Sequence, residues 1–409
     1  MMTVQNSNAV ILSERSESKD PDGLRPTTTA RTFLPKKLAP LVFLLLLLSA
    51  SVAPAQTLAH IRQTKTLRCG INIETPEYST TDDHGPRQAF DAGLCRAVAV
   101  AILGPEARVA VTTYPDDVAA MAALRADAVD LLPTLTLDLT HASAPDLAFS
   151  PPILYDGVGL LVPLSARLTR ASQLANKKIC FLAETEVEVA LRAWFLQQHM
   201  KFLPFPFQEE GEMEAAFVTG NCSALAGDRT RLVTTRLAFG PLAARYALLP
   251  DQLSDDPLAA ASRANDPAFA AIVRWTLEVL LQAEAHGLTQ QNILSSSRSD
   301  PSLSSHTSAL SSSRSAPLVS SRSAAEGSAS LTTSSANSDP IVAILTGQTR
   351  EIGSRLGLDN AWATRVISAV GNYGQLYNRT LGPQSPLDLP RAQNRLATHG
   401  GLLFPIPMK

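Results

Sequence analysis

Two series of short apolar runs, each alternating with helix-length segments, constrain this chain more than any other feature of its sequence. In the first series, runs that predict strands are separated by segments that predict helices: 67–73, 90–103, 109–114, 117–126 and 127–133. Apolar side chains recur on one face of the 90–103 segment, and Gly104-Pro105 ends it. Alternation of this kind predicts an α/β fold with largely parallel strand pairing.

The second series begins after an apolar strand, 157–162, that we expect to cross from one half of the molecule to the other. Its predicted strands and helices are 178–182, 186–199, 212–219, 223–226 and 229–237. Segment 246–250 is predicted to cross back. Amphipathic helices at 267–285 and 361–370 follow. The chain is therefore expected to form two lobes.

We predict that the first lobe consists of three stretches, 56–158, 251–294 and 341–409. The second lobe is predicted to be continuous, 159–250. Between the later stretches lies a segment, 295–340, that is dominated by Ser with scattered Arg, Ala and Thr. Such a composition buries too little apolar surface to offset the entropy of ordering, which predicts a disordered insertion. A phosphorylated or partner-binding segment is the alternative.

Residues 1–55 have the features of a leader. Lys36 and Lys37 precede the apolar run 38–48, and small residues lead to Ala53-Pro54-Ala55. This order is typical of a secretory signal, here 38–55, and the run is shorter than the roughly 20 apolar residues that span a bilayer. The alternatives are a short membrane anchor and a buried helix. We expect an exported, periplasmic protein that begins near Gln56.

The four cysteines follow this leader: Cys69, Cys95, Cys180 and Cys222. Export implies an oxidising compartment in which disulfides persist. Four cysteines allow three pairings, and the order along the chain favours Cys69–Cys95 and Cys180–Cys222, one in each lobe. A metal site is the competing interpretation, but no Cys-x-x-Cys pair supports it.

The charge balance excludes some functions. The formal net charge is -2, and the sequence pI is about 6.4, so the basic excess expected of a nucleic-acid-binding protein is absent. The sequence has no Gly-x-Ser-x-Gly elbow and no phosphate-binding loop. We therefore expect neither nucleic acid nor a cofactor as a partner.

Five motifs stand out along the chain: Leu67-Arg68-Cys69-Gly70, Leu94-Cys95-Arg96-Ala97, Tyr155-Asp156-Gly157, Leu356-Gly357-Leu358-Asp359-Asn360 and Val370-Gly371-Asn372-Tyr373-Gly374. In these motifs the chain resembles one known family, the periplasmic substrate-binding proteins of general L-amino-acid ABC transporters, a branch of the family-3 solute-binding proteins. All four cysteines fall at family positions, which supports the pairing above. The resemblance implies a two-lobed periplasmic-binding-protein-like fold of type II. Each lobe would be a mixed sheet flanked by helices, with a hinge between the lobes and an ABC transporter permease as partner.

The resemblance also implies a ligand held between the lobes. The family's first lobe supplies an Arg after a Thr-rich strand end, and here His141 stands in that place, with Thr136 and Asp138 before it. In the second lobe Thr185 is what remains of a Gly-Thr-Thr turn, and Asp228 matches the acid that meets the ammonium group. Two further candidates, with helix capping or a surface loop as their alternatives, are Asp91 and Tyr78.

These departures change the expected solute. Arg binds a carboxylate through two parallel bonds, which His does not reliably do at neutral pH. Asp138, Glu184 and Glu186 add negative charge. The hypothesis is therefore a cationic amine or a neutral polar molecule rather than an ordinary L-amino acid. The rival functions are a sensor or degenerate binding protein, and a hydrolase or dehydratase that uses His141 with neighbouring acids.

Overall fold

The computed structural model describes residues 56–72, 86–296, 339–349 and 351–408. All of them lie in one of the two units into which contacts divide the chain, Pro54–Lys409. The predicted leader, most of the Ser-rich segment and Tyr78 lie outside the described residues. Within the described part, no helix combines the length and apolarity needed to span a bilayer.

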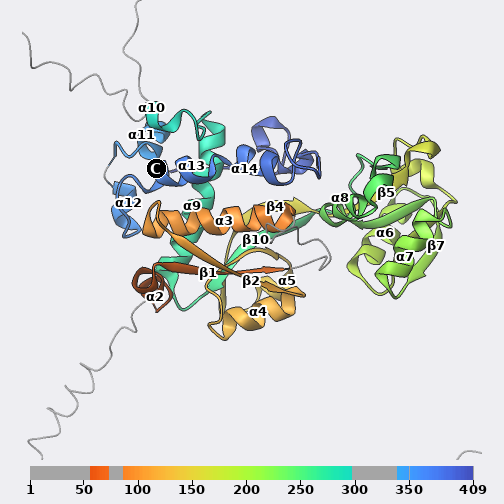
Figure 1. The fold of residues 1–409 in the computed structure, drawn as a ribbon, viewed down its shortest axis with the longest axis horizontal. Coiled ribbons are helices and arrows are strands. Elements are labelled where there is room, and N and C mark those ends of the chain that lie inside the picture. Colours follow the sequence, from red (N-terminus) through yellow and green to blue (C-terminus); the bar gives the residue numbers. More distant parts are fainter. Residues whose placement is uncertain (1–55, 73–85, 297–338, 350, 409) are drawn as a thin grey trace, which may run out of the picture. The chain divides into compact units, whose positions relative to one another are not determined.

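The first lobe contains a β–α–β unit followed by an antiparallel sheet (Figure 1). Strand β1 (Thr66–Asn72) pairs in parallel with β2 (Arg108–Tyr114), and α3 (Pro86–Leu103) lies between them in the chain. The second sheet has the order β3-β10-β4, with both pairings antiparallel. The bounds of its strands and of the nearby helices are β3 (Leu132–Thr136), β10 (Asp256–Arg263), β4 (Leu147–Asp156), α2 (Gln56–Thr64), α4 (Asp117–Arg125) and α5 (Leu139–Ala142).

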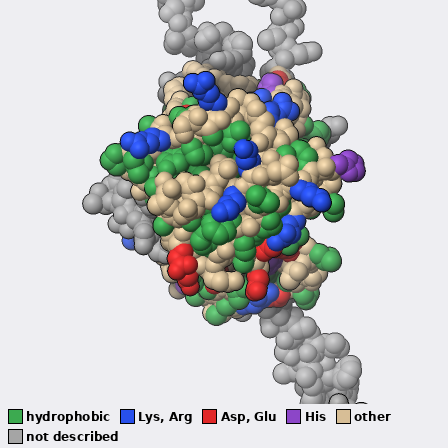
Figure 2. Space-filling model, turned by 90° about the vertical axis from the view of Figure 1, so that its right-hand side faces the viewer, with side chains coloured by type: hydrophobic (Ala, Val, Ile, Leu, Met, Phe, Trp, Pro, Cys, Tyr) green, Lys and Arg blue, Asp and Glu red, His purple; other side chains and the backbone are tan. Residues whose placement is uncertain are grey.

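The second lobe is built on one five-stranded sheet of order β7-β6-β8-β5-β9. Strands β7, β6 and β8 are parallel, whereas β5 pairs antiparallel with β8 and β9. The bounds are β5 (Val158–Pro163), β6 (Lys178–Leu182), α6 (Glu186–Gln197), β7 (Leu203–Phe207), α7 (Glu210–Val218), β8 (Ala224–Asp228), α8 (Arg229–Ala238) and β9 (Tyr246–Leu248). Figure 2 faces the end of this lobe, where Lys and Arg side chains are spread widely and few acidic side chains appear.

The connection between the two sheets runs through β4 and β10. Strand β4 ends at Asp156, β5 begins at Val158, and Asp256 at the start of β10 pairs with Asp156. Gly157 joins β4 to β5 with φ 150°. A Cβ there would collide with the carbonyl group of Ser254, so this close crossing needs glycine.

Helices of the C-terminal part complete the first lobe. Helix α9 (Pro267–Ala285) packs on α3 and β4, and α13 (Trp362–Val370) packs on α3. The rings of Tyr373 and Tyr377, from α14 (Tyr373–Thr380), meet Phe90 edge-on at 6.0 and 6.2 Å between centroids. The remaining helices are α10 (Ile293–Ser296), α11 (Pro340–Leu345) and α12 (Glu351–Arg355). The ends of the predicted 295–340 segment thus belong to α10 and α11.

A buried ion-pair network also lies in the first lobe. The carboxylate of Asp130 is fully buried and accepts hydrogen bonds from the backbone N–H, Nε and Nη2 of Arg68, the last at 2.6 Å. Nη2 of Arg263 lies 3.5 Å from the same carboxylate. The bond to Asp130 is the main reason that the pKa of Arg68 is raised. This lobe therefore neutralises its buried charge internally.

Both predicted disulfides are confirmed. Cys69, in β1, is bonded to Cys95, in α3, and Cys180, in β6, is bonded to Cys222. Each bond ties a strand to a neighbouring segment of its own lobe. The exact lobe boundaries at 158–159 and 250–251 stay predictions.

Candidate functional site

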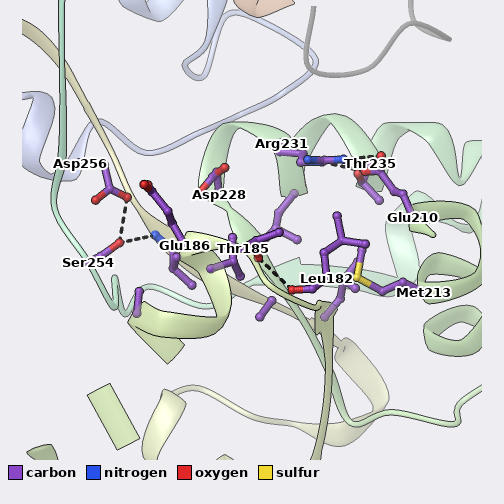
Figure 3. A pocket seen from close by; sticks show the side chains of 17 residues that line it. Leu182, Thr185, Glu186, Glu210, Met213, Asp228, Arg231, Thr235, Ser254 and Asp256 are labelled. Atoms are coloured by element: carbon purple, nitrogen blue, oxygen red, sulfur yellow. Dashed lines mark hydrogen bonds and ion pairs between the residues drawn. The ribbon is translucent and has the colours of Figure 1, made fainter. Parts of the chain in front are cut away.

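A cavity of about 190 Å³ lies at the carboxyl ends of β6 and β8 in the second lobe. Helices α6 and α8 start at this edge of the sheet, directly after those strands, and α7 starts just after β7. Ligands of α/β proteins commonly bind outside the carboxyl ends of parallel strands. The cavity is lined by Thr185, Glu186, Asp228 and Asp256 at one side and by Glu210 and Arg231 at the other (Figure 3).

A smaller crevice, of about 90 Å³, adjoins this cavity and is strongly acidic. Its lining comes from β1, β3, β4 and β10 as well as from α4, α6 and the end of β8. The lining residues are Asn72, Asp117, Thr136, Asp156, Glu186, Asp228, Asp256 and Leu258. Five of these eight described residues are acids, and none of the eight carries a positive charge.

Hydrogen bonds hold several of these acids in place. Asp117 accepts from Asn72 Nδ2 at 2.8 Å and from Thr136 Oγ1 at 3.2 Å. Asp156 accepts from the hydroxyl group of Thr230. These bonds fix the oxygens of two carboxylates without supplying a cation.

Asp256 is an acid of the crevice with a raised pKa. Burial raises the pKa of Asp256, the bond that it accepts from Ser254 Oγ opposes this, and the charges of Asp156 and Glu186 raise it further. A positive ligand group at this place would relieve the repulsion, because an opposite charge favours the ionised carboxylate.

Two arginines at the start of α8, Arg229 and Arg231, are already engaged with the protein. Arg229 is buried and donates through Nη1 to the carbonyl oxygens of Leu249 and Asp251. Burial lowers the pKa of Arg229, although the charge of Asp156 opposes this. Arg231 donates through Nε to Glu210 at 2.7 Å, and its Nη2 also pairs with that carboxylate.

Three of the predicted site residues line these cavities. Thr136 lines the crevice, Thr185 lines the larger cavity, and Asp228 lines both. The hydroxyl group of Thr185 donates to the carbonyl oxygen of Leu182 at 2.8 Å. Asp228 is the residue before α8, and no side-chain capping bond is made there.

Two other predicted residues, Asp138 and His141, pair with each other instead. Asp138 caps α5 by accepting from the backbone N–H of His141 at 2.8 Å. His141 Nδ1 lies 2.9 Å from Asp138 Oδ2, close enough for an ion pair but not aligned as a hydrogen bond. Neither residue lines either cavity, and their role in ligand binding stays a prediction.

Asp91 does not cap a helix start, because α3 begins at Pro86 rather than near residue 90. The alternative interpretation of Asp91 as a helix cap was therefore wrong, and its predicted ligand role stays a prediction. Asp91 is buried, and both of its oxygens lie 2.9 Å from the hydroxyl group of Thr134. The predicted ligand role of Tyr78 concerns a residue outside the described ranges.

The prediction omitted three acids of the crevice: Asp117, Asp156 and Asp256. A signal for Asp156 was present, because it belongs to the Tyr155-Asp156-Gly157 motif at the end of an apolar run. Asp256 precedes Pro257 in a strand that had not been predicted. Among the described residues, no group of three or more His, Cys, Asp or Glu side chains is arranged to hold a metal ion.

Comparison with known proteins gives matches over nearly the whole chain. YhdW of Escherichia coli, named as an amino-acid ABC transporter-binding protein, is 30% identical over 357 residues, which are 86% of this chain and 92% of that protein. The general L-amino acid-binding periplasmic protein AapJ of Rhizobium johnstonii is 29% identical, with 89% of this chain and 96% of that protein covered. The glutamate/glutamine/aspartate/asparagine-binding protein BztA of Rhodobacter capsulatus is 27% identical, with 88% and 96% covered.

Among solved structures, an ABC transporter periplasmic binding protein from Brucella ovis with glutathione bound matches with a TM-score of 0.65. It is 29% identical, and the match covers 86% of this chain and 98% of that one. No protein-family model matches the chain.

Proposed function

The chain belongs to the solute-binding proteins of amino-acid ABC transporters, and we propose that its solute is a small amine that the acidic crevice captures in the periplasm and that a permease at the inner membrane receives. As a member of this family, the chain is the solute-binding component of such a transporter. Its named relatives are binding proteins rather than enzymes. The nature of the solute is the part that we propose.

The single observation that carries this proposal is the charge of the crevice. Five acids surround about 90 Å³, and among the described residues no cation belongs to that lining. A carboxylate placed there would meet repulsion of about 1–4 kcal/mol for each close pair in a partly desolvated site, whereas an ammonium group would gain attraction of similar size. An amine therefore fits the crevice, and an acidic amino acid does not.

The crossing strands allow the two lobes to close around such a solute. The crevice is lined from both lobes, and Asp156 and Asp256 lie where β4 and β10 connect the lobes. Hinge closure about a few element-terminal residues is the established motion of periplasmic binding proteins. We propose that an ammonium group bridges acids of both lobes and so favours the closed state.

The solutes in the relatives' names set the comparison to be tested. One relative is named for glutamate, glutamine, aspartate and asparagine, another for L-amino acids in general, and a solved relative holds glutathione. Each of these solutes carries at least one carboxylate. The present crevice favours an amine without one.

The test is a binding screen by thermal shift and calorimetry with primary amines, L-alanine, L-glutamate and glutathione. A ligand that binds only the folded state raises the free energy of unfolding by mass action. We expect shifts with amines. Tight binding of L-alanine or L-glutamate without any amine binding would overturn the proposal. If no compound of the panel gives a thermal shift or a binding heat, the result would favour a degenerate binding protein.

A matched pair of variants locates the binding. Glu186→Gln removes a charge that lines both cavities, and Glu184→Gln removes the same charge two residues earlier, where it lines neither. We expect amine affinity to fall about tenfold in the first variant and less than about twofold in the second, since surface charges are screened. Equal effects in both variants would contradict a specific role for the crevice.

A further inference from the structure

The crevice and the larger cavity share part of their lining. An ammonium group in the crevice would leave the larger cavity unfilled. Glu186, Asp228 and Asp256 line both spaces. Figure 3 shows these three acids on one side of the larger cavity. A solute held by these acids therefore lies at the mouth of a second space that extends into the second lobe.

The interior of that second space is mainly apolar, although Thr235 also lines it. Buried side chains of β8, α7 and α8 line it, represented by Leu225, Met213 and Leu232, together with Leu182 and Val187 near the start of α6. The hydroxyl group of Thr185, which also lines it, is already bonded to the carbonyl oxygen of Leu182. The surface inside thus favours apolar groups over polar ones.

The far side of the cavity carries no net charge. Glu210 and Arg231 lie there and form a bidentate ion pair with each other. In Figure 3 this pair faces Met213, on the side away from Asp228 and Asp256. A second charged group on the solute would have to break this ion pair, because it could bind Glu210 or Arg231 only by displacing the other.

The cavity has the size of a small hydrocarbon group. Its volume is about 190 Å³, and an engineered apolar cavity of about 150 Å³ holds benzene. We propose that the solute is an amine with an uncharged apolar arm, of about the size of a phenyl ring, which enters this cavity while the ammonium group stays in the acidic crevice. This inference rests on the proposed amine function and adds the class of substituent.

Two amines that differ only in the arm test the inference. Calorimetry on the full chain should show 2-phenylethylamine binding at least about tenfold more tightly than ethylamine, since burial of each methylene is worth about fourfold in affinity. Linear alkylamines from ethylamine to hexylamine should show the same rise. A diamine of matched length should not, because its second charge would meet the apolar lining.

A variant that fills the cavity provides the structural control. Ala190, on α6, lines the larger cavity, and its neighbour Val189 lines neither space and is 69% exposed. We expect Ala190→Phe to remove the advantage of 2-phenylethylamine while ethylamine binding persists. Val189→Phe should leave both affinities unchanged. Unchanged thermal unfolding of the unliganded variants would show that both fold.

The outcomes separate the two proposals. Amines that bind with no dependence on the arm would overturn this inference and leave the amine function standing. An arm dependence that survives Ala190→Phe would place the arm elsewhere and also overturn it. Stronger binding of an ω-amino carboxylate than of the matched alkylamine would contradict the uncharged arm and point to Arg231. Absence of binding by every amine would reject the proposed function itself.

Discussion

The helix starts of the first lobe differ from those of the second. In the first lobe, α4, α9 and α14 each follow a residue whose side chain accepts a hydrogen bond from a backbone N–H of the first turn. These capping residues are Asp116, Asp266 and Asn372. These bonds satisfy donors that every helix leaves open at its start. Like the carboxylate of Asp130, these three capping side chains are bonded to groups of the first lobe itself.

In the second lobe the residues that precede α6, α7 and α8 make no such capping bond: Thr185, Glu209 and Asp228. Acidic side chains follow in the first turns of α6 and α7, where they complement the helix dipole. All three helices begin beside the larger cavity. The difference teaches that the capping side chains of these first-lobe helices are committed to the fold, whereas the uncapped helix starts of the second lobe surround a cavity.

The largest expected effect comes from breaking the buried network of the first lobe. Asp130→Ala removes the buried carboxylate that Arg68 and Arg263 share and leaves them only the exposed carboxylate of Asp127, and it should lower the free energy of unfolding by about 3–5 kcal/mol. Glu186→Ala, at an exposed acid of the second lobe, should change it by less than about 0.5 kcal/mol. Urea unfolding measures both, and equal losses would break the comparison.

A smaller effect compares two helix starts. Asp266 is fully buried and accepts from the backbone N–H groups of Phe269 and Leu58, each at 2.9 Å. We expect Asp266→Ala to cost about 2–3 kcal/mol of unfolding free energy. Thr185→Ala removes no capping bond, and it should cost less than about 1 kcal/mol. A cost for Thr185→Ala as large as for Asp266→Ala would show that α6 depends on its first residue.

The smallest effect has the opposite sign and belongs to Glu278 of α9. Burial raises the pKa of Glu278 to about 6, from 4.5, although its carboxylate accepts from the backbone N–H of Ile406. Because the folded state holds this proton more tightly than the unfolded chain, ionisation lowers stability as pH rises from about 4.5 to 6.

Glu278→Gln, which cannot ionise, should therefore gain up to about 2 kcal/mol on the parent protein at pH about 8 relative to pH about 4. Urea unfolding at the two pH values measures this difference. The same change at the exposed Glu106 should leave the pH profile of the parent in place. If Glu278→Gln leaves the pH profile of stability unchanged, other groups of the fold must stabilise the ionised carboxylate of Glu278 and offset the cost of its burial.

The sequence predicted elements best where periodicity and local stop signals agreed. Strand 178–182 and helix 267–285 appear with the predicted bounds as β6 and α9. Both disulfides followed from their order in the chain and from family positions. These features depend on short stretches of sequence, which is why they were accessible without the structure.

Strands that contain proline were missed. Strand β4 includes Pro151 and Pro152, which cannot donate to a ladder, and the side chain of Ser150 accepts the backbone N–H of Ala260 beside them at 2.9 Å. Strand β7 contains Pro204 and Pro206 and lies at the edge of its sheet. Prolines are tolerated in these strands because the strands lie at a sheet edge or at a shift in register. Neither position can be recognised from the local sequence pattern.

The candidate site was predicted only in part for a related reason. Asp228 and Thr185 follow strands that were predicted, so their place at a sheet edge was expected. Asp117 lies on the first turn of α4, where an acid also suits the helix dipole. Its approach to the crevice depends on how β1, β3 and α4 pack together, which is long-range information.

The prolines of β7 have a further consequence for the edge of the second-lobe sheet. An edge strand exposes unpaired backbone groups that can template pairing with another chain, and this is a common start of aggregation. Pro204 and Pro206 remove two N–H donors from that edge, and the opposite edge, β9, is only three residues long. The edges of the sheet that carries the cavity are therefore poor templates for β-strand pairing with a neighbouring molecule.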